Sequence, residues 1–324
     1  LRGIAWRELG SNGEADSLLS LGLSEDIAAD DEALFLFQRG LARQALGLSD
    51  QAALDLEAAA TSVDLSFEGS LSLTIALRDI GEYDRSAEVA ARILATANPN
   101  PQDPLYLHVD SLGVLVPSTV DSMVAGLLMP AVGSATRMAA YYLISGRARL
   151  SQGLEEDALA SFDAAVAEAV SSQAAADAAF YATELRLRDA RRPEDVTALL
   201  SSYSVARRAS KSEMRERVNR WERASAEFEG LIAAYEGRGA SAAEAILRVA
   251  ELARIDLESL ALARGSYLLY LDLVPDSRWA AKAIYGALSV SGHQPDPSWV
   301  DDRGPDTDAE LRRLLATLPP DDPY

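Results

Sequence analysis

The stretch that decides the fold is residues 139–170, AAYYLISGRARLSQGLEEDALASFDAAVAEAV. Small and bulky side chains alternate in it at fixed intervals, at Tyr142, Gly146, Gly153, Ala158, Phe162 and Ala165. Gly146 and Ala158 allow two antiparallel helices to approach closely, and the aromatic rings fill the gaps between neighbouring pairs. Gly153 supplies the turn that joins the two helices. The stretch therefore predicts a helical hairpin.

An earlier part of the chain has the same spacing. Its small and bulky residues are Leu36, Gly40, Gly47, Ala52, Leu56 and Ala59. Leucines stand here where the later copy has aromatic residues. Weaker copies are expected over 67–100, 177–208 and 244–276. A helix pair that recurs along a chain is typical of a repeat protein, in which each pair contacts its neighbours.

The repeated unit resembles the tetratricopeptide repeat family. That pattern has a bulky and then a small residue on the first helix, a turn glycine, and Ala-x-x-x-aromatic on the second helix. The resemblance implies an all-α fold, a right-handed superhelical solenoid of antiparallel helix pairs. It also implies a groove, lined by the first helix of each pair, that binds extended peptides or protein termini.

Four polar side chains are the expected groove residues under this resemblance. They are Arg147, Tyr181, Arg188 and Arg248. Exposed arginine and tyrosine are frequent anchors in protein interfaces. The guanidinium groups are expected to bind carboxylates of a protein or peptide partner. The apolar residues near these four positions can instead pack against adjacent helices and take no part in binding.

Composition supports the all-α prediction and limits the possible partners. Alanine and leucine, both strong helix formers, supply most of the apolar residues. A formal charge of −20 disfavours nucleic acid and anionic lipid as partners. The chain has no cysteine, which excludes disulfides and thiolate chemistry. The longest uncharged apolar run, 123–132, is far shorter than the roughly 20 residues of a spanning helix, so no direct membrane span is expected.

Proline-rich and apolar segments predict how the chain is organised. Four parts are expected: N-terminal repeats over 1–100, an irregular helical linker over 101–137, C-terminal repeats over 138–290, and a Pro/Asp-rich tail with a short helix over 291–324. Pro117 is expected to divide the linker into two helices. An apolar stripe predicts one long helix over 211–236, which either packs within the solenoid or forms an oligomer contact.

The sequence contains no recognisable catalytic motif. His108 and His293 have no metal-ligand context, and nucleophile elbows and phosphate loops are absent. The acidic residues Asp301, Asp302, Asp306, Asp308 and Glu310 lack the alternation and the glycine of a calcium loop. Ser241 and Glu244 predict a capping box. We therefore expect a protein that is not an enzyme and that uses no cofactor and no metal.

The arginine-rich stretch from Arg186 to Arg223 stands out in this acidic chain. Interleaved acids could neutralise it through ion pairs, or it could be a docking patch for an anionic surface, including that of another copy. Two further functions stay open: a structural subunit that self-assembles into a fibre or ring, and the helical accessory region of a cell-wall enzyme.

The expected location follows from one further likeness. Residues 274–283, VPDSRWAAKA, are similar to repeat junctions in bacterial envelope lipoproteins. The bacterial cell envelope, either periplasmic or associated with the outer membrane, is the expected location, with the cytoplasm as the alternative. The chain begins at Leu1 and its first methionine is Met123, so the start is expected to be a processing boundary.

Overall fold

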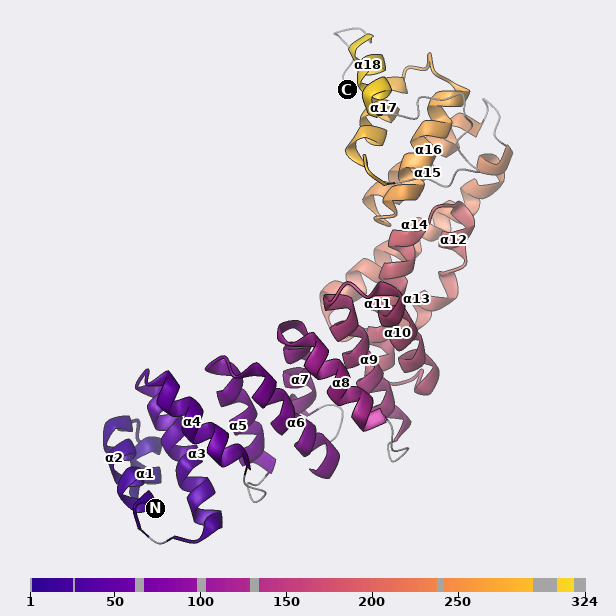
Figure 1. Cartoon of the computed structure of the whole chain (residues 1–324). Coiled ribbons are helices and arrows are strands. Elements are labelled where there is room, and N and C mark those ends of the chain that lie inside the picture. The colour runs from indigo at the N-terminus through magenta and orange to yellow at the C-terminus, as the bar shows by residue number, and fades with distance from the viewer. Residues whose placement is uncertain are drawn as a thin grey trace. The chain divides into compact units, whose positions relative to one another are not determined.

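The computed structural model describes residues 2–25, 27–61, 67–97, 103–128, 134–237, 242–293 and 308–317. Every regular element in these ranges is a helix and none is a strand, which confirms the all-α prediction (Figure 1). The chain forms two compact units, Leu1–Ala169 and Val170–Tyr324. The division between them falls inside the range 138–290, which was expected to be one set of repeats, and the four-part organisation stays a prediction.

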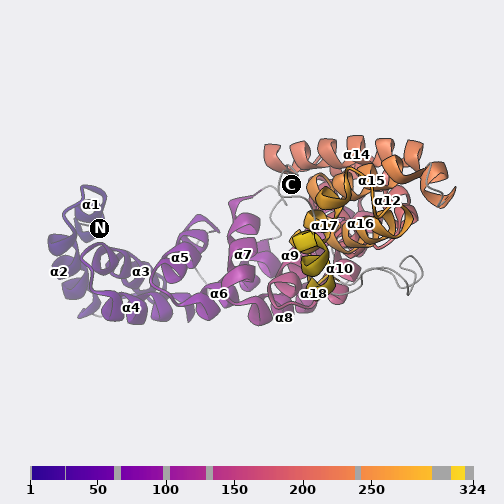
Figure 2. The same cartoon turned by 90° about the horizontal axis from the view of Figure 1, so that it is seen from above.

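The first unit is a succession of helix pairs. Its helices are α1 (Arg2–Glu8), α2 (Asn12–Leu23), α3 (Ala29–Ala45), α4 (Ser49–Thr61), α5 (Phe67–Asp79), α6 (Tyr83–Ala97), α7 (Pro104–Leu115), α8 (Pro117–Leu128), α9 (Ala135–Ser151) and α10 (Glu155–Glu168). Consecutive helices pack in twos, and the second helix of each pair packs against the next pair (Figure 2). Pro117 begins α8, as expected.

A glycine of the first helix meets a bulky side chain of the second helix in the two strong copies. A Cβ added at Gly146 would lie 2.5 Å from Cε1 of Phe162, and one added at Gly40 would lie 2.7 Å from Cγ of Leu56. Both bulky side chains are fully buried. Ala158 is buried as well, but it is the ring of Phe162 that lies nearest to Gly146. The helices can approach this closely because glycine has no side chain.

The helix pair formed by α1 and α2 was not predicted from the sequence. Gly3 and Leu19 have the same separation as Gly40 and Leu56, and a Cβ added at Gly3 would lie 2.7 Å from Cγ of Leu19. The turn glycine of this pair, Gly10, has the positive φ of the other turns. The turn glycines and their φ angles are Gly10 (79°), Gly47 (75°), Gly81 (93°) and Gly153 (76°). The signal was therefore present in the sequence as a third copy of one spacing.

Arginines at equivalent positions of the repeat bind acidic side chains of the preceding helix pair. Arg43 of α3 binds Asp16 of α2 (Nε–Oδ1 2.7 Å) and Asp55 of α4 (Nη1–Oδ2 2.8 Å). Arg149 of α9 binds Asp121 of α8 (Nε–Oδ1 3.1 Å) and donates to a serine hydroxyl of α10. Each guanidinium thus bridges its own pair and the pair before it. Because the planar fork fixes the direction of its hydrogen bonds, these arginines also fix how successive pairs meet.

His108 of α7 lies in a buried hydrogen-bonded chain that joins three helices. Arg78 of α5 approaches its Nδ1 at 3.5 Å, and its Nε2 lies 3.0 Å from Oγ of Ser86 in α6. The Ser86 hydroxyl donates to the carbonyl of Thr74 (2.6 Å). All these groups are satisfied when the imidazole is neutral, with its proton on Nε2. Burial, together with the nearby Arg78 charge, lowers the pKa of His108 from 6.5 to about 4.

The second unit has less regular pairs. Its helices are α11 (Gln173–Asp189), α12 (Pro193–Thr197), α13 (Leu200–Ala206), α14 (Ser212–Gly237), α15 (Ala243–Ile255), α16 (Leu260–Leu273), α17 (Ala280–Ser289) and α18 (Asp308–Thr317). The bounds of α14 confirm the long helix expected over 211–236. The repeat expected over 177–208 implied a pair made of two helices. In the structure, two short helices, α12 and α13, take the place of the second helix of that pair. α15 packs on both α14 and α16, and α16 packs on α17.

The close contact in the first unit predicts opposite effects of two glycine substitutions. Gly146→Ala should lower the free energy of unfolding by about 1–3 kcal/mol, because the methyl group must displace the ring of Phe162. Gly126→Ala in α8 is the matched control. Nothing lies within 4 Å of its added Cβ, so it should raise stability by about 0.5–1 kcal/mol. Urea unfolding followed by circular dichroism measures both, and equal effects would contradict the packing described.

The buried histidine predicts a pH dependence of stability. Between the unfolded pKa of 6.5 and the folded pKa of about 4, the unfolded chain binds the additional proton, so stability falls as the pH is lowered. The full contribution is about 3 kcal/mol, present above pH 6.5. His108→Gln cannot titrate, so its unfolding free energy should fall less steeply than that of the wild type over this range. Parallel curves for the two proteins would show that His108 has an unperturbed pKa.

Candidate functional site

The predicted groove residues are distributed over both units. Arg147 lies on α9 of the first unit, where its Nη1 forms an ion pair with Oδ2 of Asp110 in α7. The other three lie in the second unit. Tyr181 and Arg188 are on α11, where Tyr181 is half-buried with its ring edge-on to Phe180 (centroids 5.5 Å apart), and Arg188 is exposed. Their role in binding stays a prediction.

Arg248 on α15 already binds a carboxylate of its own chain. Its Nε and Nη2 donate to Oε1 and Oε2 of Glu227 on α14, at 2.5 and 2.9 Å. This bidentate hydrogen bonding lowers the pKa of Glu227 and raises the pKa of Arg248. A partner carboxylate would therefore have to compete with Glu227 for the same edge of the guanidinium.

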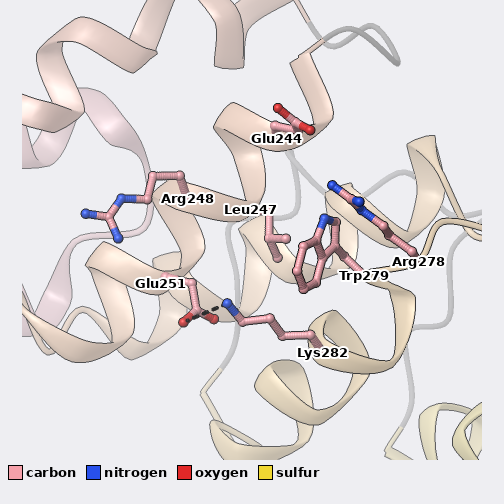
Figure 3. A pocket seen from close by; sticks show the side chains of 7 residues that line it. All are labelled: Glu244, Leu247, Arg248, Glu251, Arg278, Trp279 and Lys282. Carbon is pink, nitrogen blue, oxygen red and sulfur yellow. Dashed lines mark ion pairs between the residues drawn. The ribbon is translucent and has the colours of Figure 1, made fainter. Parts of the chain in front are cut away.

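An open pocket lies beside Arg248, between α15 and the start of α17 (Figure 3). Its volume is about 310 Å³, and its lining residues are Glu244, Leu247, Arg248, Glu251, Arg278, Trp279 and Lys282. The first four occupy positions i, i+3, i+4 and i+7 of α15 and so lie on one face of that helix. The last three come from the turn before α17 and from its first helical turn. The pocket is thus built by two helices that are separated by α16 in the sequence.

Trp279 is the centre of the pocket. The guanidinium carbon of Arg278 lies 5.0 Å from the centroid of its indole, and Nζ of Lys282 lies 6.0 Å from that centroid. Figure 3 shows the indole next to the side chain of Leu247. The site therefore combines an apolar surface with cations that are attracted to the face of the ring.

Lys282 and Glu251 close one end of the pocket. Nζ of Lys282 lies 3.5 Å from Oε2 of Glu251 (Figure 3). Glu251 also accepts the hydroxyl of Tyr267, and Arg254 lies 3.7 Å from the same Oε2. Burial, and then the hydrogen bond to Glu251, raises the pKa of Tyr267. Because several donors converge on this one carboxylate, this end of the pocket is held in a single arrangement.

Glu244 and Arg278 occupy the other end of the pocket (Figure 3). Within the described part of the chain, neither side chain has an ion pair or a hydrogen bond, and the guanidinium of Arg278 lies over the indole of Trp279. The carboxylate of Glu244 is thus available to accept hydrogen bonds from a ligand, and the guanidinium of Arg278 is available to donate them. Arg278, Trp279 and Lys282 were expected only as part of a junction motif over 274–283 and were not predicted to form a site. A tryptophan flanked by cations was the signal.

Much of the arginine-rich stretch is engaged within the second unit. Arg208 donates to the carbonyl of Val170 (2.6 Å), and Arg215 donates to the carbonyls of Ala209 and Ser210 (2.7 Å each). These carbonyls follow helix ends, where backbone acceptors lack intrahelical partners. Arg207 binds Glu222 in the same stretch. Of these three arginines, only Arg207 is paired with an acid, so both interpretations of the arginine-rich stretch stay predictions.

Arg217, which is half-buried, has a different role in the second unit. Its guanidinium lies 5.5 Å from the ring centroid of Phe180 and 5.1 Å from that of Trp221. It also binds Glu184 (2.6 Å) and Glu258 (3.2 Å). The side chain therefore joins α11 and α14 to the turn between α15 and α16.

Several other predicted features can now be placed. In the part that the structure describes, no group of three or more side chains could hold a metal ion. Asp308 binds Arg264 (2.9 Å), and His293 contacts the carbonyl of Val290. Asp301, Asp302 and Asp306 lie outside the described residues, as does Ser241 of the expected capping box.

Comparison with known proteins does not place the chain in a family. None of the helices described is long and apolar enough to cross a membrane. No protein-family model and no curated protein matches the sequence. The function must therefore be argued from the site itself.

Proposed function

We propose that the chain is a non-enzymatic scaffold of tetratricopeptide type that binds a protein or peptide partner. The observation that carries this proposal is the open pocket around Trp279, in which an aromatic ring, a carboxylate and a guanidinium face solvent together. Aromatic and arginine side chains at the centre of a hollow are the usual anchors of protein interfaces. The repeated helix pairs supply a rigid support for such a surface.

The chemistry of the pocket favours binding over catalysis. Its ionisable side chains are arginine, lysine and glutamate, and two of the three cations are paired with glutamates, Lys282 with Glu251 and Arg248 with Glu227. Among the described residues that line it, none is a histidine, serine or threonine that could form a nucleophile with a base. The net charge of −20 disfavours nucleic acid as the partner. Placement in the bacterial cell envelope belongs to the same proposal and is supported by the junction motif that contains Trp279.

Self-association is a second candidate, and the first helix pair favours it. Trp6 is 42% exposed and Leu9 is 77% exposed. A shallow hollow is lined by Trp6, Gly13, Glu14, Ser17 and Leu18. An apolar surface of this kind could be covered by another copy of the chain. Light scattering at increasing protein concentration tests this, and a constant monomer mass would exclude it.

The scaffold function is tested by partner capture with a matched pair of aromatic variants. Immobilised wild-type protein should retain a defined set of proteins from a native extract, identified by mass spectrometry. Trp279→Ala should reduce their recovery at least tenfold, about 1.4 kcal/mol, because it removes the anchor of the pocket. Tyr285→Ala is the control, since Tyr285 lies on α17, the helix that Trp279 precedes, is exposed, and does not line the pocket.

Two results would contradict the proposal in different ways. If the wild type retains no protein, the scaffold function is wrong. If Trp279→Ala and Tyr285→Ala retain the same proteins as the wild type, the chain binds partners elsewhere, and the face of α9 that carries Arg147 becomes the next surface to test.

A further inference from the structure

We infer that the Trp279 pocket binds an extended peptide segment through its main-chain amides and one apolar side chain, and not through carboxylates. This inference rests on the scaffold function proposed above and names the ligand class of its site. It differs from the expectation that Arg248 and the other groove arginines bind acidic groups. Three features of the pocket carry it: the charges that are already paired, the two groups that are not, and the apolar surface between them.

The cations that would attract a carboxylate are largely engaged. Arg248 holds Glu227 with two hydrogen bonds, and Lys282 lies against Glu251. An acidic ligand would have to replace one of these carboxylates, and the carboxylate set free would remain beside it. Glu244 adds a further negative charge to the lining, in a chain with a net charge of −20. Electrostatics therefore gives an acidic ligand little advantage in this pocket.

The two unengaged groups match a peptide backbone. The carboxylate of Glu244 can only accept hydrogen bonds, and the guanidinium of Arg278 can only donate them. Each residue of an extended chain presents one N–H and one C=O. Glu244 can accept from the N–H while Arg278 donates to the C=O. A lone carboxylate or a lone ammonium ion would satisfy only one of the two.

The surface between these groups is suited to an apolar side chain. The half-buried indole of Trp279 and the edge of Leu247, which is 8% exposed, form the middle of the pocket (Figure 3). A volume of about 310 Å³ is at the small end of ligand pockets, which fits one side chain with its flanking amides.

Arg278 is also preorganised for this role. Its guanidinium is held against the indole, with 5.0 Å between the guanidinium carbon and the ring centroid. Stacking uses the face of the guanidinium and leaves its edge, which carries the N–H donors, available for hydrogen bonds. Less side-chain freedom is then lost when a ligand binds.

The inference is tested by titrating capped tripeptides into the full chain. The indole N–H signals are followed by NMR, and Trp279→Phe assigns the signal of Trp279 among those of the four tryptophans. The probes are acetyl-Ala-Leu-Ala-amide, the same peptide with an N-methylated leucine, and acetyl-Ala-Asp-Ala-amide. Each is added up to about 10 mM, where even a ligand with a millimolar Kd saturates its site.

The leucine peptide should shift the Trp279 signal in a saturable way. Its N-methylated form should bind at least fivefold more weakly, because the N–H for Glu244 is lost, and the aspartate peptide should give no saturable shift. Glu244→Ala should weaken the leucine peptide to the same degree as N-methylation, while the control Glu229→Ala, exposed on α14, should not. Raising NaCl from about 0.05 to about 0.5 M should change the Kd of the leucine peptide by less than about threefold. The capped peptide carries no charge, so it forms hydrogen bonds and no ion pair with Glu244 and Arg278.

Stronger binding of the aspartate peptide than of the leucine peptide would overturn the inference in favour of carboxylate recognition. Equal binding of the N-methylated and unmodified peptides would overturn the main-chain contact. No shift with any probe would also overturn it. If partner capture still depends on Trp279 in that case, the scaffold function stands and only the ligand class is wrong.

Discussion

The close approach of a glycine to a bulky side chain is the constraint on which the first unit depends. Gly40 receives Leu56, and Gly146 receives Phe162, at distances that leave no room for a Cβ. This contact sets the separation of the two helices in a pair. The ion pairs between successive helix pairs follow from it. Arg43 and Arg149 lie at the same distance along the chain from their glycines, and each binds an aspartate in the second helix of the preceding pair.

The sequence was sufficient to predict the helical fold because its signals are local. Glycine and alanine at fixed spacing identified the hairpins around Gly40 and Gly146, and an apolar stripe identified α14. The same spacing was present around Gly3 but was not recognised. In the copy over 177–208, Pro193 begins a short helix, α12, and α13 follows it, so the repeat pattern does not describe the second unit as closely as the first.

The candidate site was harder to predict because it depends on which side chains meet in three dimensions. Arg248 was identified from its position on the first helix of a pair, and it does line a pocket, but its guanidinium binds Glu227 of a different helix. Trp279 and Glu244 are separated by all of α16, so no spacing rule relates them. An ion pair between distant residues follows from tertiary packing, and composition alone cannot assign it.

The central claim is that a partner binds the second unit at the pocket between α15 and α17, and hydrogen–deuterium exchange of the full chain tests it most directly. Exchange is measured with and without the partner recovered by capture. The account predicts slower exchange in 243–255 and 278–289 when the partner is bound, because main-chain amides at a covered site are shielded from solvent. Protection confined to the first unit, with these two segments unchanged, would contradict it.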